Sequence, residues 1–213
     1  PDMYQILIGS VKVNHLMGVP LIEVDQQLMP VWQFMLKRLF DMVTSTVFLI
    51  VGFLFLLFIG IMTKISSKGP MFFKQIRIGK DQKPFYIYKF RSMYINSESQ
   101  GPALSSDNDP RITKWGKLMR KTRMDELPQF WNVLKGDMTI VGPRPERNHF
   151  IKQIENVAPY YRQLLKVKPG ITSLGQVKYG YAENVDQMVR RLGFDIVYIC
   201  LLYTSDAADE EDS

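Results

Sequence analysis

The stretch RKTRMDELP, residues 120–128, places two adjacent carboxylates among three basic side chains, directly before a predicted helix. Pro128 suits the first turn of that helix, and Gly136 is a typical residue just beyond a helix C-terminus. We therefore expect Asp125 and Glu126 at the start of the helix, where its dipole and nearby arginines favour ionised carboxylates. Two such carboxylates sharing a cation could serve phosphoryl transfer. A solvated helix start has the same pattern, so the pair alone leaves both interpretations open.

A second motif follows within residues 136–146, where a short apolar run leads into a turn that presents Arg144 between two prolines. Because the prolines restrict the backbone on both sides, the guanidinium is positioned at a lower entropic cost. Such an arginine suits phosphate binding. The run from Arg120 to Glu146 resembles the core signature of the bacterial sugar transferase family, the polyprenyl-phosphate hexose-1-phosphate transferases, which are monotopic phosphoglycosyl transferases.

The resemblance extends from about Lys37 to about Ile199 and includes KFRSM at residues 89–93 and KPGIT at residues 168–172. It implies transfer of a sugar 1-phosphate from a UDP-sugar to a polyprenyl phosphate carrier lipid, with release of UMP. It also implies two phosphoryl-transfer steps through an aspartyl phosphosugar. The expected setting is the first membrane step of exopolysaccharide, capsule or O-antigen synthesis.

The resemblance also implies roles for individual residues. By matched motif position it assigns the nucleophile to Asp125, the Mg²⁺ contact and proton handling to Glu126, and phosphate binding to Arg120 and Arg144. Lys89 and Arg91 are further candidates for contact with substrate phosphate or lipid phosphate. Mg²⁺ is the expected cofactor, because a diphosphate repels a carboxylate nucleophile unless its charge is neutralised.

Residues 42–63 form a run without a charge that is rich in Phe, Leu, Ile and Val. About 20 apolar residues suffice to cross a bilayer, so we expect a membrane-inserted helix over residues 37–68. Basic residues flank both ends, and the loop-charge rule therefore leaves a spanning and a re-entrant arrangement open. Family members bend a re-entrant helix at a Ser-Pro pair, whereas this chain has Gly52-Phe53-Leu54 there. A glycine bends a helix less reliably than a proline does.

The remaining pattern predicts short elements. Two strands are expected at residues 71–78 and 85–93, forming a hairpin that would present Lys89 and Arg91. Residues 112–119 have the pattern of a basic amphipathic helix, which is typical of a membrane interface and equally of a core-facing helix. Further helices are predicted at residues 148–167, interrupted at Pro159, and at residues 185–199, and a polar loop at residues 96–110.

Composition narrows the function classes. The net charge is +6, and it is +11 once the acidic last eight residues are set aside. This suits nucleic acid, anionic lipid headgroups or phosphorylated substrates. The resemblance to the sugar transferase family implies anionic lipid and phosphorylated substrates as partners, and no nucleic acid. The single cysteine excludes an intramolecular disulfide, the histidines give no zinc spacing, and no glycine-rich nucleotide fingerprint supports ATP or NAD chemistry.

We therefore predict a mostly helical α+β protein, with a short β-hairpin and interfacial amphipathic helices. Residues 1–36 are interpreted as the remnant of an N-terminal domain or linker, residues 37–68 as the membrane-inserted helix, residues 69–199 as the catalytic domain, and residues 200–213 as a tail unrelated to the family. The resemblance implies residence in the bacterial inner (cytoplasmic) membrane, with the catalytic domain facing the cytoplasm.

Two other hypotheses stay open at this point. A non-catalytic, membrane-anchored basic module that binds anionic lipid or nucleic acid would explain the charge and the apolar run. It gives Asp125, Glu126 and Arg144 no role. A degenerate family member serving as a scaffold would fit the missing proline and the acidic tail.

Overall fold

The structure is a computed structural model that describes residues 11–16, 19–24, 30–95, 97, 101, 104 and 109–210, with secondary structure alone for residues 11–16, 19–24 and 203–210. Its helices are α2 (Val31–Val51), α3 (Phe53–Ser66), α4 (Lys114–Lys121), α5 (Gln129–Lys135), α6 (Asn148–Val157), α7 (Leu174–Lys178) and α8 (Val185–Glu210). Short 3₁₀ segments are η1 (Lys80–Gln82), η2 (Met124–Glu126) and η3 (Pro159–Lys166). The predicted mostly helical character is confirmed.

The strands described in the structure form pairs. Antiparallel pairs are β1 (Val11–Leu16) with β2 (Val19–Val24) and β3 (Phe72–Ile78) with β4 (Pro84–Phe90), and β5 (Thr139–Val141) runs parallel to β6 (Gly170–Thr172). The predicted hairpin is confirmed as β3–β4, with Phe72 opposite Phe90 and their rings stacked at 5.3 Å. The β5–β6 pair was not predicted, because three residues per strand are too few to show an alternation.

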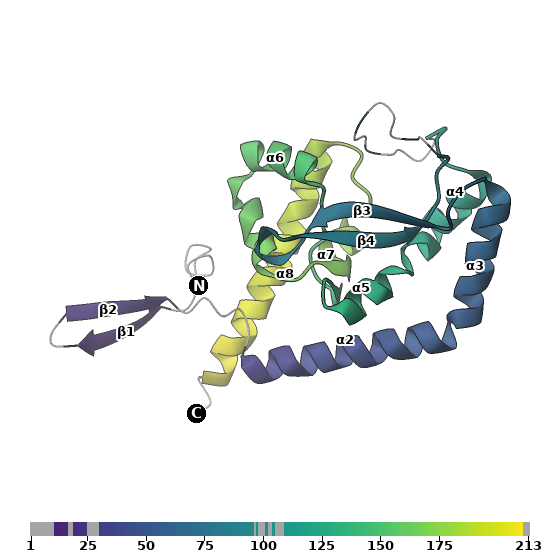
Figure 1. Ribbon diagram of the computed structural model, residues 1–213. Coiled ribbons are helices and arrows are strands. Elements are labelled where there is room, and N and C mark those ends of the chain that lie inside the picture. The colour runs from purple at the N-terminus through teal and green to yellow at the C-terminus, as the bar shows by residue number, and fades with distance from the viewer. Residues whose placement is uncertain are drawn as a thin grey trace.

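The predicted membrane-inserted segment over residues 37–68 corresponds to two helices, α2 and α3, whose boundaries differ from the predicted ones. Helix α2 begins earlier, at Val31, and meets α3 at a bend of 65° (Figure 1). The bend lies at Gly52, whose N–H still donates to the Phe48 carbonyl at 2.8 Å. A Cβ at this position would lie 2.6 Å from that oxygen, so glycine permits a close approach that other residues do not. In the described residues no single helix is long and apolar enough to cross a membrane, and only this bent pair qualifies by length and composition.

The two helices have an unusual distribution of polar side chains. Their buried positions include Asp41, Ser45 and Thr63. Their exposed positions are largely apolar, with Ile50 70% and Leu54 76% accessible. A helix on the surface of a water-soluble domain has the opposite arrangement, because burying apolar area is what stabilises it there. The exposed apolar surface of α2 and α3 is therefore suited to contact with lipid or with another protein rather than with water.

Three apolar clusters hold the rest of the described chain together. The largest joins α6, η3 and α8, and its most buried members are Ile154, Ala158, Met188 and Leu192. Ile59, Phe90 and Met119 tie α3 to β4 and α4. Ile87, Val133 and Met138 tie β4 to α5. The β3–β4 hairpin thus lies between the bent helix pair and the C-terminal helices (Figure 1).

Helix α5 ends as the sequence predicts. Gly136 has φ 91°, the left-handed conformation that favours glycine at a helix end. Two carbonyls at this end accept from Arg38 of α2, with Nη1 2.6 Å from the Val133 oxygen and Nη2 3.0 Å from the Leu134 oxygen. Asp41 of α2 accepts from the Thr139 hydroxyl at 2.5 Å. These polar contacts explain why the inner face of α2 is polar.

Candidate active site

Asp125 and Glu126 lie in the separate segment η2, immediately before α5, rather than in the helix itself. Arg123 precedes them with φ 60°, a left-handed conformation that is uncommon outside glycine and turns the chain at this point. The two carboxylates are 4% and 5% exposed. The interpretation of the pair as an ordinary solvated helix start is therefore wrong, because a burial this deep requires charged partners.

Glu126 is surrounded by cations from three parts of the chain. Its Oε1 lies 2.6 Å from Lys89 Nζ of β4 and 3.0 Å from Arg144 Nη2, in the turn after β5. Its Oε2 lies 3.7 Å from Arg123 Nη1. Burial alone would raise the pKa of Glu126, but Arg144 and Lys89 outweigh burial and hold this pKa well below its ordinary value.

Asp125 has the opposite electrostatic character. Burial raises the pKa of Asp125 above its ordinary value, and Lys89 opposes the shift without cancelling it. Arg120 and Arg144 lower the pKa of Asp125, as expected, but they do not outweigh its burial. Adjacent carboxylates whose pKa values are pushed apart are suited to different chemical roles.

A cavity of about 580 Å³ lies against this pair. All but one of the residues predicted for the site line it: Lys89, Arg91, Arg120, Asp125 and Arg144. Glu126, the exception, lies behind the wall and is joined to it through its ion pairs with Lys89 and Arg144. Asp125 Oδ1 is buried and accepts no hydrogen bond from the part of the chain that the structure describes. The site thus offers an unpaired carboxylate oxygen beside a strongly cationic cavity.

Arg91 has a structural contact in addition to its place in the cavity wall. Its Nη2 donates to the Ser67 carbonyl at 2.6 Å and to the Ser67 hydroxyl at 2.9 Å. It therefore joins the end of α3 to the end of β4. The phosphate-binding role of Arg91 stays a prediction, as do the roles of Lys89, Arg120 and Arg144.

Sequence reasoning missed a second ionic cluster in the same cavity. Glu146 Oε2 lies 3.1 Å from Arg77 Nη1 of β3, and its Oε1 lies 2.6 Å from Arg191 Nη2 of α8. All three residues line the cavity. Glu146 directly follows the Pro143-Arg144-Pro145 turn, which was the available signal, but neither arginine has a local motif. The cluster fixes the Arg144 turn between the hairpin and the last helix.

The cavity also contains an aromatic ring. The guanidinium of Arg123 lies 4.0 Å from the centroid of the Tyr181 ring, a cation–π contact. Tyr181 lines the cavity, and burial raises the pKa of its hydroxyl. No sequence signal identified this tyrosine.

The residues present fit a magnesium ion that is shared with a substrate. Within the described ranges no three acids, histidines or cysteines form a cluster that could enclose a metal. Asp125 Oδ1, at the cavity wall, accepts no hydrogen bond from the described residues, whereas Glu126 lies behind the wall with its Oε1 paired to Lys89 and Arg144. A carboxylate oxygen suits Mg²⁺, which usually keeps water and phosphate oxygens in its coordination shell. Asp125 is the residue that would hold it, and the Mg²⁺ contact of Glu126 stays a prediction.

Comparison with known proteins gives matches over most of the chain. A family model described as bacterial sugar transferase matches residues 32–204, which include both carboxylates and their cationic partners. The chain belongs to the bacterial sugar transferase family. It is 40% identical over 195 residues to the UDP-N-acetylgalactosamine-undecaprenyl-phosphate N-acetylgalactosaminephosphotransferase of Aeromonas hydrophila, covering 92% of this chain and 45% of that protein.

Two other relatives have related names. The UDP-glucose:undecaprenyl-phosphate glucose-1-phosphate transferase of Klebsiella pneumoniae is 37% identical over 201 residues, 93% of this chain and 43% of that protein. The exopolysaccharide production protein PSS of Rhizobium leguminosarum bv. phaseoli is 40% identical over 173 residues, 77% of this chain and 85% of that protein. The chain thus spans less than half the length of the Aeromonas and Klebsiella proteins.

Proposed function

We propose that this chain is the catalytic part of an enzyme that transfers a sugar 1-phosphate from a UDP-sugar to polyprenyl phosphate and releases UMP. The names of the Aeromonas and Klebsiella relatives support this reaction class. The observation that carries the proposal is the unpaired, buried Oδ1 of Asp125 at the wall of a cavity lined by Lys89, Arg120 and Arg144. A nucleophile and a place for phosphate charge are thereby adjacent.

The reaction would proceed in two displacements at one phosphorus atom. Asp125 Oδ1 forms a bond to the β-phosphorus of the UDP-sugar, the bond from that phosphorus to the bridging oxygen breaks, and UMP leaves. A phosphate oxygen of polyprenyl phosphate then attacks the same phosphorus and displaces the Asp125 carboxylate. The product is a polyprenyl diphosphosugar, and the enzyme returns to its starting state.

The surrounding residues would stabilise charge during both displacements. Lys89 and Arg144 present fixed cations that need no rearrangement when charge develops on the phosphoryl oxygens. Glu126 keeps both of them at the cavity wall through contacts of 2.6 and 3.0 Å. Mg²⁺, when bound, would neutralise diphosphate charge. Arg120 adds a further cation from the end of α4.

The carrier lipid requires that the site lies beside a membrane. We propose that α2 and α3 form a re-entrant pair in the bacterial inner membrane, with the catalytic residues on the cytoplasmic side. The 65° bend and the apolar exposed face of both helices support this arrangement. The Rhizobium relative, named for exopolysaccharide production, supports a role at the first membrane step of such a pathway.

The test is UMP release by detergent-solubilised protein from a panel of UDP-sugars, with polyprenyl phosphate and Mg²⁺. We expect release with at least one sugar, loss of it on removal of Mg²⁺, and a loss of about 10³-fold or more in Asp125→Asn. The matched control Glu155→Gln neutralises a surface carboxylate paired with Arg162 and should retain full activity.

An Asp125→Asn variant as active as wild type would contradict the proposal. So would wild type that releases no UMP with any sugar, even when residues 200–213 are replaced by a family-like terminal helix. If Asp125→Asn binds membranes as wild type does, its loss of activity reflects a catalytic defect and not a loss of folded protein.

A further inference from the structure

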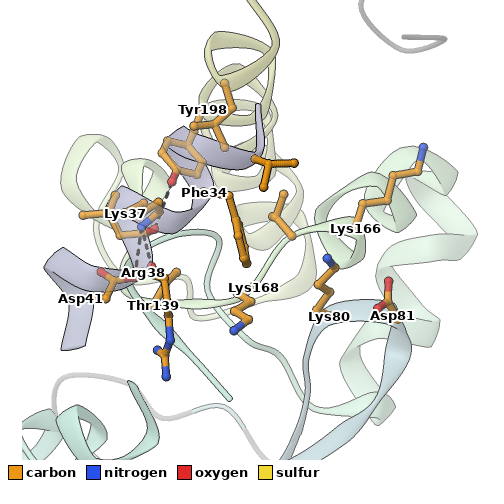
Figure 2. Close-up of a pocket in the computed structure, with 14 residues that line it drawn as sticks. Phe34, Lys37, Arg38, Asp41, Lys80, Asp81, Thr139, Lys166, Lys168 and Tyr198 are labelled. Carbon is orange, nitrogen blue, oxygen red and sulfur yellow. Dashed lines mark hydrogen bonds and ion pairs between the residues drawn. The ribbon is translucent and has the colours of Figure 1, made fainter. Parts of the chain in front are cut away.

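A second cavity, of about 430 Å³, lies beside the η1 turn of the β3–β4 hairpin (Figure 2). It is formed by the start of α2, the η1 turn, β5, the end of η3 with the segment that follows it, and the C-terminal half of α8. It shares no lining residue with the catalytic cavity. The proposed transfer reaction therefore does not account for its composition.

Five basic residues line this cavity, and three of them, Arg38, Lys80 and Lys168, lie close together. Lys168 lies close to Arg38, because a Cβ at Gly136 would lie 3.4 Å from Arg38 Nη2 and 3.8 Å from Lys168 Nζ. Lys80 lies beside Lys168 in Figure 2. Burial lowers the pKa of Lys168, and the charges of Arg38 and Lys80 lower it further. Cations that destabilise one another in this way form a site for an anion.

The acids of the cavity do not neutralise these three cations. Asp41 is already engaged, since it accepts from Lys37 at 3.5 Å, from the Thr139 hydroxyl at 2.5 Å and from the Ile140 N–H at 3.2 Å. Asp81 is exposed at the η1 turn. Within the described residues the side chains of Lys80 and Lys168 make no hydrogen bond or ion pair with either acid. The cavity therefore keeps an excess of positive charge.

One wall of the cavity is apolar and continues onto the exposed surface of α2. Val31 and Phe34 line it and are 58% and 47% exposed, and Figure 2 shows the Phe34 ring projecting into it. Trp32, on the same helical turn, is 61% exposed. Tryptophan is enriched at the depth of lipid headgroups. A ligand that fits both walls has an anionic group joined to an apolar chain.

We propose that this cavity binds an anionic phospholipid, with its headgroup phosphate at Lys80 and Lys168 and an acyl chain along Phe34 and the exposed face of α2. The inference rests on the membrane insertion of α2 and α3 proposed above, but not on the transfer chemistry. Occupation by the lipid would neutralise the cations and hold the start of α2 at the headgroup layer.

The test is native mass spectrometry of the whole detergent-solubilised chain, titrated with short-chain phosphatidylglycerol or phosphatidylcholine. Wild type should retain one phosphatidylglycerol, and should bind phosphatidylcholine about tenfold more weakly. The Lys80→Gln/Lys168→Gln variant should lose at least about tenfold in phosphatidylglycerol affinity, since each cation near an anionic lipid contributes about 1 kcal/mol. Lys152→Gln/Lys178→Gln removes the same charge from exposed positions outside the cavity and should bind like wild type.

The Lys80→Arg/Lys168→Arg variant keeps both charges and should restore retention, which separates lost binding from a folding defect. Equal binding of phosphatidylglycerol by wild type and the double glutamine variant would overturn the proposal. Thermal stabilisation of wild type by inorganic phosphate alone, equal to that given by phosphatidylglycerol, would instead assign the site to a soluble phosphate. UMP release serves as an independent readout: the double glutamine variant should retain it, whereas Asp125→Asn should lose it and still retain the lipid.

Discussion

At the scale of single residues, the site depends on a buried anion that is balanced by buried cations. Lys89 and Glu126 have side chains that are 16% and 6% exposed and lie 2.6 Å apart. Removing one partner of a buried pair leaves an uncompensated charge, which is far more destabilising than the pair itself is stabilising. We predict that Lys89→Met lowers the free energy of unfolding by about 3 kcal/mol.

The same pair allows a test by a double-mutant cycle. Lys89→Met/Glu126→Gln should recover more than 1 kcal/mol relative to the sum of the single changes, because the double variant removes both charges of this contact at once. Arg162→Met, which breaks an exposed pair with Glu155, should change stability by less than about 0.5 kcal/mol. Chemical unfolding in detergent measures all four variants. Additive effects of Lys89→Met and Glu126→Gln would show that the contact carries no coupling.

At the scale of elements, a substitution at Gly52 can distinguish a steric requirement for glycine at the bend between α2 and α3 from the low helix propensity of glycine. Gly→Ala inside a helix normally stabilises by about 0.5–1 kcal/mol. We predict the opposite sign for Gly52→Ala, a loss of about 1–2 kcal/mol, because the added Cβ would meet the Phe48 carbonyl at 2.6 Å. Gly193→Ala in α8 is the matched control, since a Cβ there has no neighbour within 4 Å among the described atoms, and it should stabilise.

Thermal unfolding in detergent distinguishes these two glycines. Stabilisation by both alanines would mean that the helix can straighten or shift at Gly52 without loss. Destabilisation by both would point to a general intolerance of side chains, with no special role for the bend. Only opposite signs support a glycine requirement at the junction of α2 and α3.

At the scale of the whole molecule, the apolar helix pair is connected to the catalytic segment by few polar contacts. Arg38 of α2 donates to two carbonyls at the end of α5, and α5 directly follows the segment that carries Asp125 and Glu126. We predict that Arg38→Met destabilises the chain by about 2 kcal/mol and lowers the rate of UMP release, because hydrogen bonds from a charged donor contribute about 1.5–3 kcal/mol. Arg38→Lys should lose less of both.

The measurements for this prediction are kcat from UMP release and the midpoint of thermal unfolding. Loss of stability with an unchanged kcat would show that α2 supports the fold without positioning the catalytic segment. An unchanged midpoint of thermal unfolding would show that the end of α5 does not need the hydrogen bonds from Arg38. Retention of phosphatidylglycerol by Arg38→Met in native mass spectrometry provides a separate test of the second cavity, because Arg38 lines it.

The sequence by itself determined the features that depend on neighbouring residues. Pro128 and Gly136 lie at the two ends of α5, and the alternation around residues 71–93 gives the β3–β4 hairpin. The Asp125-Glu126 pair marks the segment that we propose to be catalytic. Such signals are local, since helix ends, turns and strand alternation are set by residues a few positions apart.

Only the tertiary structure decided the features that depend on distant residues. It showed that the carboxylates are buried, that Lys89 pairs with Glu126 across 37 positions, and that Glu146 joins Arg77 to Arg191. It also showed that the pKa of Asp125 is raised while that of Glu126 is lowered, a difference that the sequence did not predict. Burial and electrostatic partners arise when segments far apart in the chain pack together, and no local pattern records that packing.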